Sequence, residues 1–236
     1  MRHNVIRHPI QLQHGGPREI ALFDTGLSRC VAREILDGDA YPLLPFDVLE
    51  PESVQTIFDV GSNVGASCLY WLDNYPHATV YAYEPCRDAY QLLVQNTAGL
   101  KVVTHNVALG AEDGLTDLYH NVEDDACNSL VNHKSHGHEK VVVERARHHL
   151  YQPCDIVKID TEGSETEILA DIEAWLCDIQ VLYLEYHSED QRLSLDKLLG
   201  RTHLLWCSRA ERPHRGEQCF VRRDRIPQRF ADWEIR

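Results

Sequence analysis

Short apolar runs alternate with amphipathic segments along most of the chain. Buried strands are predicted for TIFDV, ATVYAYEP, KVVTHNVALG, CDIVKID and IQVLYLEYH, because each is a short run rich in apolar or β-branched residues. Helical periodicity follows in ASCLYWLDNY and DAYQLLVQNTAG, and again behind CDIVKID. Strands that alternate with helices indicate an α/β fold with a mostly parallel, doubly wound sheet.

The two ends of the chain depart from this alternation. LSRCVAREILDGDAYP predicts a short amphipathic helix, and the C-terminal HLLWCSRAERPHRGEQCFVRRD predicts an antiparallel hairpin at the sheet edge. We therefore expect residues 1–53 to be a helical or irregular extension packed on the core, and residues 54–236 to be one domain. The apolar face of the first helix is expected to consist of Cys30, Val31, Ile35 and Leu36.

Residues 111–140 are polar and interrupt the pattern. Their Glu, Asp, Asn and His content predicts an insertion or lid rather than core. His133, His136 and His138 in NHKSHGH offer metal ligands, but no paired ligands stand nearby, so a polar loop is the preferred interpretation.

The composition fits one sizeable core. The chain has 236 residues with 43% hydrophobic content, no apolar run long enough for a membrane helix and no signal-peptide pattern at its start, so a cytoplasmic protein is expected. Its eight cysteines include no C-x-x-C pair, which disfavours zinc sites and disulfide frameworks. We expect most of them to be reduced and to act as small apolar residues.

The net charge of −14 argues against nucleic acid as a partner. The charge is uneven, because residues 201–236 hold nine arginines against five acids. A solvated basic hairpin is the simpler interpretation of this end, and a phosphate- or carboxylate-bearing substrate is the alternative. A monomer or homodimer without membrane attachment is expected.

A glycine-rich turn follows the first predicted strand. In TIFDVGSNVG, Gly61 and Gly65 allow a ligand to approach the backbone closely, and N–H groups of the turn could receive a carboxylate or phosphate. Asp59 stands just before the turn, where its charge suits a cationic ligand and would repel a pyrophosphate. Glu84 ends the second strand, placed to accept both hydroxyls of a ribose. The G-x-G-x-x-G of a nicotinamide-dependent oxidoreductase is missing.

These motifs, taken with NVALG, NSL at 128–130 and VKIDTEGSETEIL, resemble the FkbM-type class I S-adenosylmethionine-dependent methyltransferases. The resemblance covers roughly residues 35 to 187 and implies a Rossmann-like fold with an antiparallel edge. It also implies S-adenosyl-L-methionine as cofactor and methyl transfer to a hydroxyl of a sugar or other secondary metabolite.

The resemblance assigns site residues by their place in the motifs. It implies that the cofactor is held by Asp59, Gly61, Ser62, Asn63, Gly65, Glu84, Asn106 and Val107. Asp160, Glu162 and Glu165 are the acids of K-I-D-x-E-G-x-E, and one of the three is expected to be a plain surface acid. Ser164 and Glu167 predict a capping box for the helix that follows.

Catalysis is expected from Asp160, Glu162 and His187, which follow the fourth and fifth strands. One of them could take the proton of an alcohol acceptor as a general base. A divalent cation held by Asp160 and Glu162 is the open alternative, although no metal is predicted. An inactive cofactor-binding module, or a methyltransferase acting on a macromolecule, would share these motifs.

Overall fold

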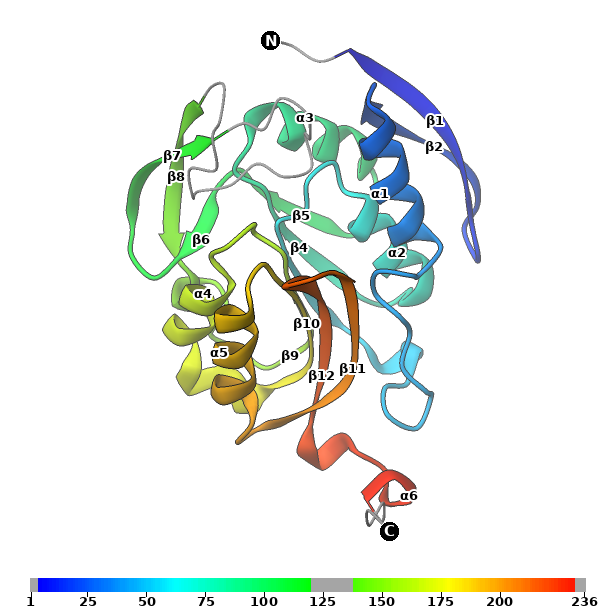
Figure 1. Ribbon diagram of the computed structural model, residues 1–236. Helices are drawn as coiled ribbons and strands as arrows, with labels where there is room; N and C mark the ends of the chain where they lie inside the picture. Colours follow the sequence, from blue (N-terminus) through cyan, green and yellow to red (C-terminus); the bar gives the residue numbers. More distant parts are fainter. Residues whose placement is uncertain (1–3, 120–137, 232–236) are drawn as a thin grey trace.

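The computed structural model describes residues 4–119 and 138–231 and is built around a seven-stranded sheet of order β11-β12-β10-β9-β3-β4-β5 (Figure 1). The parallel strands are β3 (Thr56–Val60), β4 (Thr79–Tyr83), β5 (Val102–His105), β9 (Cys154–Ile159) and β10 (Ile179–Tyr186). The hairpin of β11 (His203–Arg212) and β12 (Arg215–Arg222) adds antiparallel to β10. The predicted mostly parallel sheet with an antiparallel C-terminal hairpin is confirmed.

Helices cover both faces of this sheet (Figure 1). One face carries α1 (Gly26–Leu36), α2 (Ala66–Asn74) and α3 (Arg87–Asn96), and the other carries α4 (Glu165–Asp171) and α5 (Glu189–Leu199). Trp71 and Tyr183 lie in the apolar core of the first face, and Leu169 and Leu195 in that of the second. The short helices are η1 (Pro51–Ser53), η2 (Ala146–His148), η3 (Glu173–Asp178), η4 (Arg223–Arg225) and α6 (Gln228–Ala231). Among the described residues, no helix is long and apolar enough to cross a membrane.

The third predicted strand divides into two. After β5, the chain leaves the main sheet and forms β6 (Ala108–Gly110), which joins β7 (Gly114–Tyr119) and β8 (His138–Arg145) in a small sheet of order β6-β8-β7. The expectation that residues 111–140 form an insertion or lid rather than core is therefore wrong for Leu118, which is buried in an apolar cluster together with Leu92 of α3. Residues 120–137, which include NSL, His133 and His136, lie outside the described residues.

The N-terminal extension is more ordered than expected. Residues predicted to be helical or irregular form a hairpin of β1 (Val5–Leu12) and β2 (Gly16–Phe23) ahead of the expected helix α1. Side chains of β1 alternate between exposed and half-buried, and four residues at the end of β2 are buried. The period of two is weak in the sequence, because the exposed positions of β1 include the apolar Val5 and its half-buried positions include the polar His8. Cys30, expected on the inner face of α1, is exposed.

Asn96 fastens the hairpin to the core. Its buried amide accepts a hydrogen bond from the Ala21 N–H (2.8 Å) and donates to the carbonyls of Ala21 (2.9 Å) and Val64 (2.8 Å). An Asn96→Ala variant leaves these buried backbone groups unpaired and should lose about 1–3 kcal/mol of unfolding free energy. Urea unfolding measures the change, with Gln95→Ala at the exposed neighbouring position as the control. Equal stability of the two variants would contradict this anchoring role.

Candidate active site

A cavity opens where the order of the sheet reverses. The chain runs outward from β3 to β5 and then returns to the other side of β3 with β9, and the carboxyl ends of these strands border the cavity. Seven of the predicted site residues line it, namely Gly61, Ser62, Asn63, Glu84, Val107, Asp160 and Glu162. Asp59, Gly65, Asn106 and His187 do not. The cavity is also lined by Ser28, Val31 and Ile35 of α1 and by Leu118 of β7, and no sequence motif marks these residues as part of a site.

The glycine turn is pressed against the end of β9. Gly61 has a φ of 82°, and a Cβ atom there would lie 1.7 Å from the Asp160 carbonyl oxygen, so only glycine fits. The N–H groups of Gly61 and Ser62 both donate to the Tyr83 carbonyl, at 2.9 and 3.0 Å. The Asn63 N–H donates to the Glu84 carboxylate at 2.8 Å. These three N–H groups already donate hydrogen bonds within the protein. The expectation that they are free to receive a carboxylate or phosphate is therefore wrong.

Glu84 stands at the end of β4 and faces the cavity. Its second carboxylate oxygen accepts from the Cys86 N–H at 2.7 Å, and burial raises the pKa of Glu84 to about 7 although both N–H bonds lower it. The Asn106 side chain donates to the carbonyl oxygens of Glu84 and Pro85, so Asn106 fixes the backbone here instead of lining the cavity. The Asn63 side-chain oxygen is buried without a hydrogen-bond partner and is available to a ligand.

Asp59 points into the protein and not into the cavity. Its carboxylate is fully buried, and it lies 3.4 Å from the ammonium of Lys158, which is 2% exposed. The expected contact of Asp59 with a cationic ligand is therefore replaced by an internal ion pair. Lys158 also donates to the Gly61 carbonyl, so it joins β9 to the glycine turn. Gly65, with a φ of 88°, serves as the N-cap of α2 and packs against Leu93.

Asp160 is held by three neighbours. The Lys158 ammonium is 3.5 Å away, the Tyr41 hydroxyl donates at 3.3 Å, and the carboxyl group of Glu185 lies close enough to influence the ionisation of Asp160. Burial opposes ionisation of Asp160, but Lys158 and Glu185 outweigh burial and lower its pKa to about 2. Burial and the charge of Asp160 raise the pKa of Glu185 well above its usual range. Asp160 is thus a stabilised anion with little basicity.

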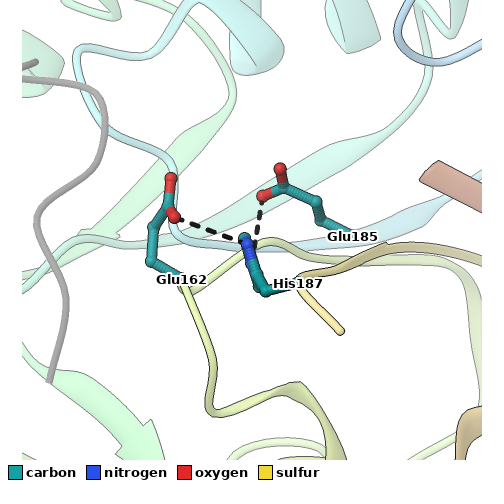
Figure 2. Close-up of side chains that lie close together, drawn as sticks. All are labelled: Glu162, Glu185 and His187. Carbon is teal, nitrogen blue, oxygen red and sulfur yellow. Dashed lines mark ion pairs between the residues drawn. The ribbon is translucent and has the colours of Figure 1, made fainter. Parts of the chain in front are cut away.

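Glu162, Glu185 and His187 gather at the ends of β9 and β10 (Figure 2). Figure 2 shows the imidazole between the two carboxylates, with Nδ1 3.6 Å from Glu162 and Nε2 3.4 Å from Glu185. Arg215 of β12 contacts Glu185 at 2.6 Å and Glu162 at 3.2 Å. Glu162 has a φ of 58°, a conformation that costs free energy in a non-glycine residue and directs this carboxylate between the cavity and His187.

Glu165 holds the turn after β9 and contacts His187. It is fully buried and accepts hydrogen bonds from the N–H groups of Thr161 (2.8 Å) and Gly163 (3.2 Å). His187 lies 3.5 Å from it, and although burial disfavours the imidazolium, Glu165 and Glu162 raise the pKa of His187. None of the three motif acids is a surface acid, so that expectation is wrong. The Ser164 capping box is also absent, because Glu165 satisfies the N–H groups ahead of α4.

The described residues contain one group of three metal-capable side chains, Glu162, Glu185 and His187, with donor atoms within 4.8 Å of one another. Asp160, expected as a ligand with Glu162, is not among them. The positive charge of Arg215 already lies against both carboxylates of the group. This arrangement favours a network of protein charges over a divalent cation.

Comparisons with known proteins agree with this geometry. The Methyltransferase FkbM domain matches residues 59–202. The chain is similar to the solved methyltransferase FkbM from Methylobacillus flagellatus KT, at 18% identity and a TM-score of 0.53, over 77% of this chain and 45% of that one. It therefore spans less than half the length of that protein. No curated protein matches the chain.

Two further solved structures share the fold. One is the Methanococcus jannaschii fibrillarin pre-rRNA processing protein, at 10% identity and a TM-score of 0.51, over 92% of this chain and 82% of that one. The other is the T. thermophilus 16S rRNA methyltransferase RsmC in complex with AdoMet and guanosine, at 11% identity and a TM-score of 0.51, over 93% and 51%. The predicted Rossmann-like class I methyltransferase fold is confirmed.

Proposed function

The chain belongs to the FkbM family of S-adenosylmethionine-dependent methyltransferases, and from that premise we propose that it methylates a hydroxyl group of a small molecule, such as a sugar or another secondary metabolite. One observation carries the proposal. The Glu162 carboxylate borders the cavity in a strained backbone conformation, backed by His187 and Arg215, where an acceptor hydroxyl must lose its proton.

The cofactor is S-adenosyl-L-methionine, and the residues around the cavity fit it. Glu84 offers free lone pairs to the two ribose hydroxyls beyond its backbone bonds. The unpaired oxygen of Asn63 can accept from a further donor of the cofactor, and Val107 gives an apolar contact for the adenine. The N–H groups of Gly61, Ser62 and Asn63 are bonded within the protein and are not free to bind a pyrophosphate.

The charge state of Glu84 should control cofactor affinity. An ionised carboxylate accepts from hydroxyls more strongly than a neutral one, and the pKa of Glu84 is about 7. Affinity for 5′-methylthioadenosine, which keeps the ribose but has no amino acid charges, should rise about tenfold from pH 6 to pH 8. Calorimetry measures it, and Glu84→Gln should remove the pH dependence. An equal pH slope in this variant would refute the assignment.

The same shift affects the unliganded protein. The folded state keeps a proton on Glu84 that the unfolded state has lost, so stability should fall as the pH rises from about 4.5 to about 7. Cofactor affinity and the stability of the free protein therefore change in opposite directions over this range.

The acceptor binds beside Glu162 in this proposal. When bound, S-adenosyl-L-methionine would supply an activated methyl group to the acceptor oxygen. Glu162 takes the hydroxyl proton as the general base. His187 and Arg215 hold the Glu162 carboxylate in position, and Asp160 keeps Lys158 and Tyr41 in place.

A small acceptor is supported by the charge of the chain. The net charge of −14 would repel a nucleic acid, although some proteins of the same fold act on RNA. The test is transfer of a labelled methyl group from the cofactor to methyl glycosides and phenolic alcohols, with a mixed tRNA and rRNA pool in parallel. Labelled small molecules support the proposal. Labelled RNA alone, or cofactor binding without turnover, would replace it by the macromolecular or the inactive alternative.

A further inference from the structure

The β11–β12 hairpin brings two cysteines together. Cys207 of β11 and Cys219 of β12 are direct partners in the antiparallel register, and both are free thiols. Directly opposed residues have Cα atoms about 4.5–5.5 Å apart, which lies within the roughly 4.4–6.8 Å that a disulfide bridges. Their side chains leave the sheet on the same face, so both sulfurs lie on one side of the hairpin.

A second cavity gives access to this pair. It lies between the hairpin and the loop after α1, and Cys207 and Cys219 line it together with Tyr41 and Tyr183. Cys207 is half-buried and Cys219 is buried. A small reagent that enters the cavity therefore meets Cys207 first.

The two thiols differ in reactivity. The hydrogen bond from the Cys219 thiol lowers the pKa of Cys207 to about 7, although burial opposes this. Burial, followed by the contact with Cys207, raises the pKa of Cys219 well above its usual range. Near neutral pH, Cys207 therefore supplies the thiolate that attacks first, and Cys219 supplies the thiol that attacks in the second step.

We propose that Cys207 and Cys219 form a thiol modification site, at which a low-molecular-weight disulfide converts the pair into an intrachain disulfide. The Cys207 thiolate attacks one sulfur of the reagent, forms a mixed disulfide and releases one thiolate. Cys219 then loses its proton to that thiolate and attacks the Cys207 sulfur, which releases the second half of the reagent. Two protein thiols are oxidised and one reagent disulfide is reduced to two thiols.

The remaining described cysteines set the selectivity. Cys30 and Cys177 are exposed, but they lie in a helix and a 3₁₀ helix and have no ladder partner. Cys68, Cys86 and Cys154 are buried, and burial raises their pKa values. The exposed cysteines should therefore react only as far as a mixed disulfide with the reagent. Cys68, Cys86 and Cys154 should not react with it.

The experiment treats the folded full-length chain at pH 7.5 with 2-hydroxyethyl disulfide, blocks the remaining thiols with iodoacetamide, and maps peptides without reduction. A peptide pair linked through Cys207 and Cys219, about 2 Da below the sum of its reduced parts, is the expected product. Dithiothreitol should reverse it. Both residues recovered as alkylated thiols, or Cys207 as a stable mixed disulfide, would overturn the proposal.

Serine variants separate the two steps. Cys219→Ser should accumulate the mixed disulfide on Cys207, whereas Cys207→Ser should leave Cys219 unmodified. The Cys30→Ser chain is the control and should still form the link. Modification of Cys219 in the Cys207→Ser variant would show that the proposed order of attack is wrong. Peptide mapping reads this result directly, whatever the stability of the variant.

Discussion

A Lys158→Met variant should lose about 3–5 kcal/mol of unfolding free energy, because it leaves the buried carboxylate of Asp59 without its cation. The ammonium of Lys158 also lies 3.5 Å from Asp160 and donates to the Gly61 carbonyl. Burial disfavours the charged lysine, but Asp160 and Asp59 outweigh it and raise the pKa of Lys158. Lys158 therefore stays positively charged in the folded state. A methionine at this position keeps the approximate length of the side chain but not its charge.

Chemical unfolding of matched variants tests this ion pair. Lys140→Met removes an exposed ammonium that pairs with half-buried Asp117 and should cost at most about 1 kcal/mol. Adding Asp59→Asn to Lys158→Met removes one unpaired charge and should recover part of the loss. If Lys158→Met is as stable as Lys140→Met, the charges of Asp59 and Asp160 are compensated elsewhere.

A Glu162→Gln variant should turn over about 10²–10⁴-fold more slowly than the parent, because the amide keeps the shape but cannot take a proton. Its affinity for S-adenosylhomocysteine should stay nearly unchanged, since the proposed cofactor contacts are those of Glu84 and Asn63. Labelled methyl transfer measures the first quantity and calorimetry the second. Glu167→Gln, at an exposed position of α4, is the control and should keep full activity.

Two results would count against Glu162 as the base. Normal turnover with weakened cofactor binding would place Glu162 on the cofactor side. Loss of parent activity with a chelator, restored by Mg²⁺ or Mn²⁺, would show that Glu162, Glu185 and His187 hold a cation in place of the Arg215 charge. An Arg215→Met variant separates the two mechanisms further. It should lower activity if Arg215 holds Glu162 in position, and it should strengthen metal binding if Glu162, Glu185 and His187 hold a cation.

The central sheet and the glycine turn could be predicted from the sequence because local signals specify them. Continuous apolar runs marked β3, β9 and β10, and a G-x-x-x-G spacing marked the turn. The motif acids Asp160 and Glu162 both line the cavity. In these segments, the structure that the local sequence pattern favours is also the one that burial in the fold stabilises.

The side chains that tune the site could not be predicted, because their partners are distant in sequence. Lys158 looks like one polar residue in a buried strand until β3 brings Asp59 beside it. Arg215 belongs to a basic hairpin whose composition suggests solvent exposure, yet its guanidinium contacts Glu185. The N-terminal hairpin could not be predicted because the inward positions of β1 are only half-buried up to Leu12 and include the polar His8, so the alternation of polar and apolar residues is weak.

The first helix forms part of the cavity wall through Ser28, Val31 and Ile35, so the proposed binding of the cofactor in this cavity would be linked to the docking of the helix. A ligand that touches these residues binds only the docked form, so its free energy of binding also stabilises docking. At a hundredfold excess over Kd the gain is about 2.7 kcal/mol. Reciprocally, under this proposal a change that loosens residues 5–36 should lower cofactor affinity without altering Glu84 or the glycine turn.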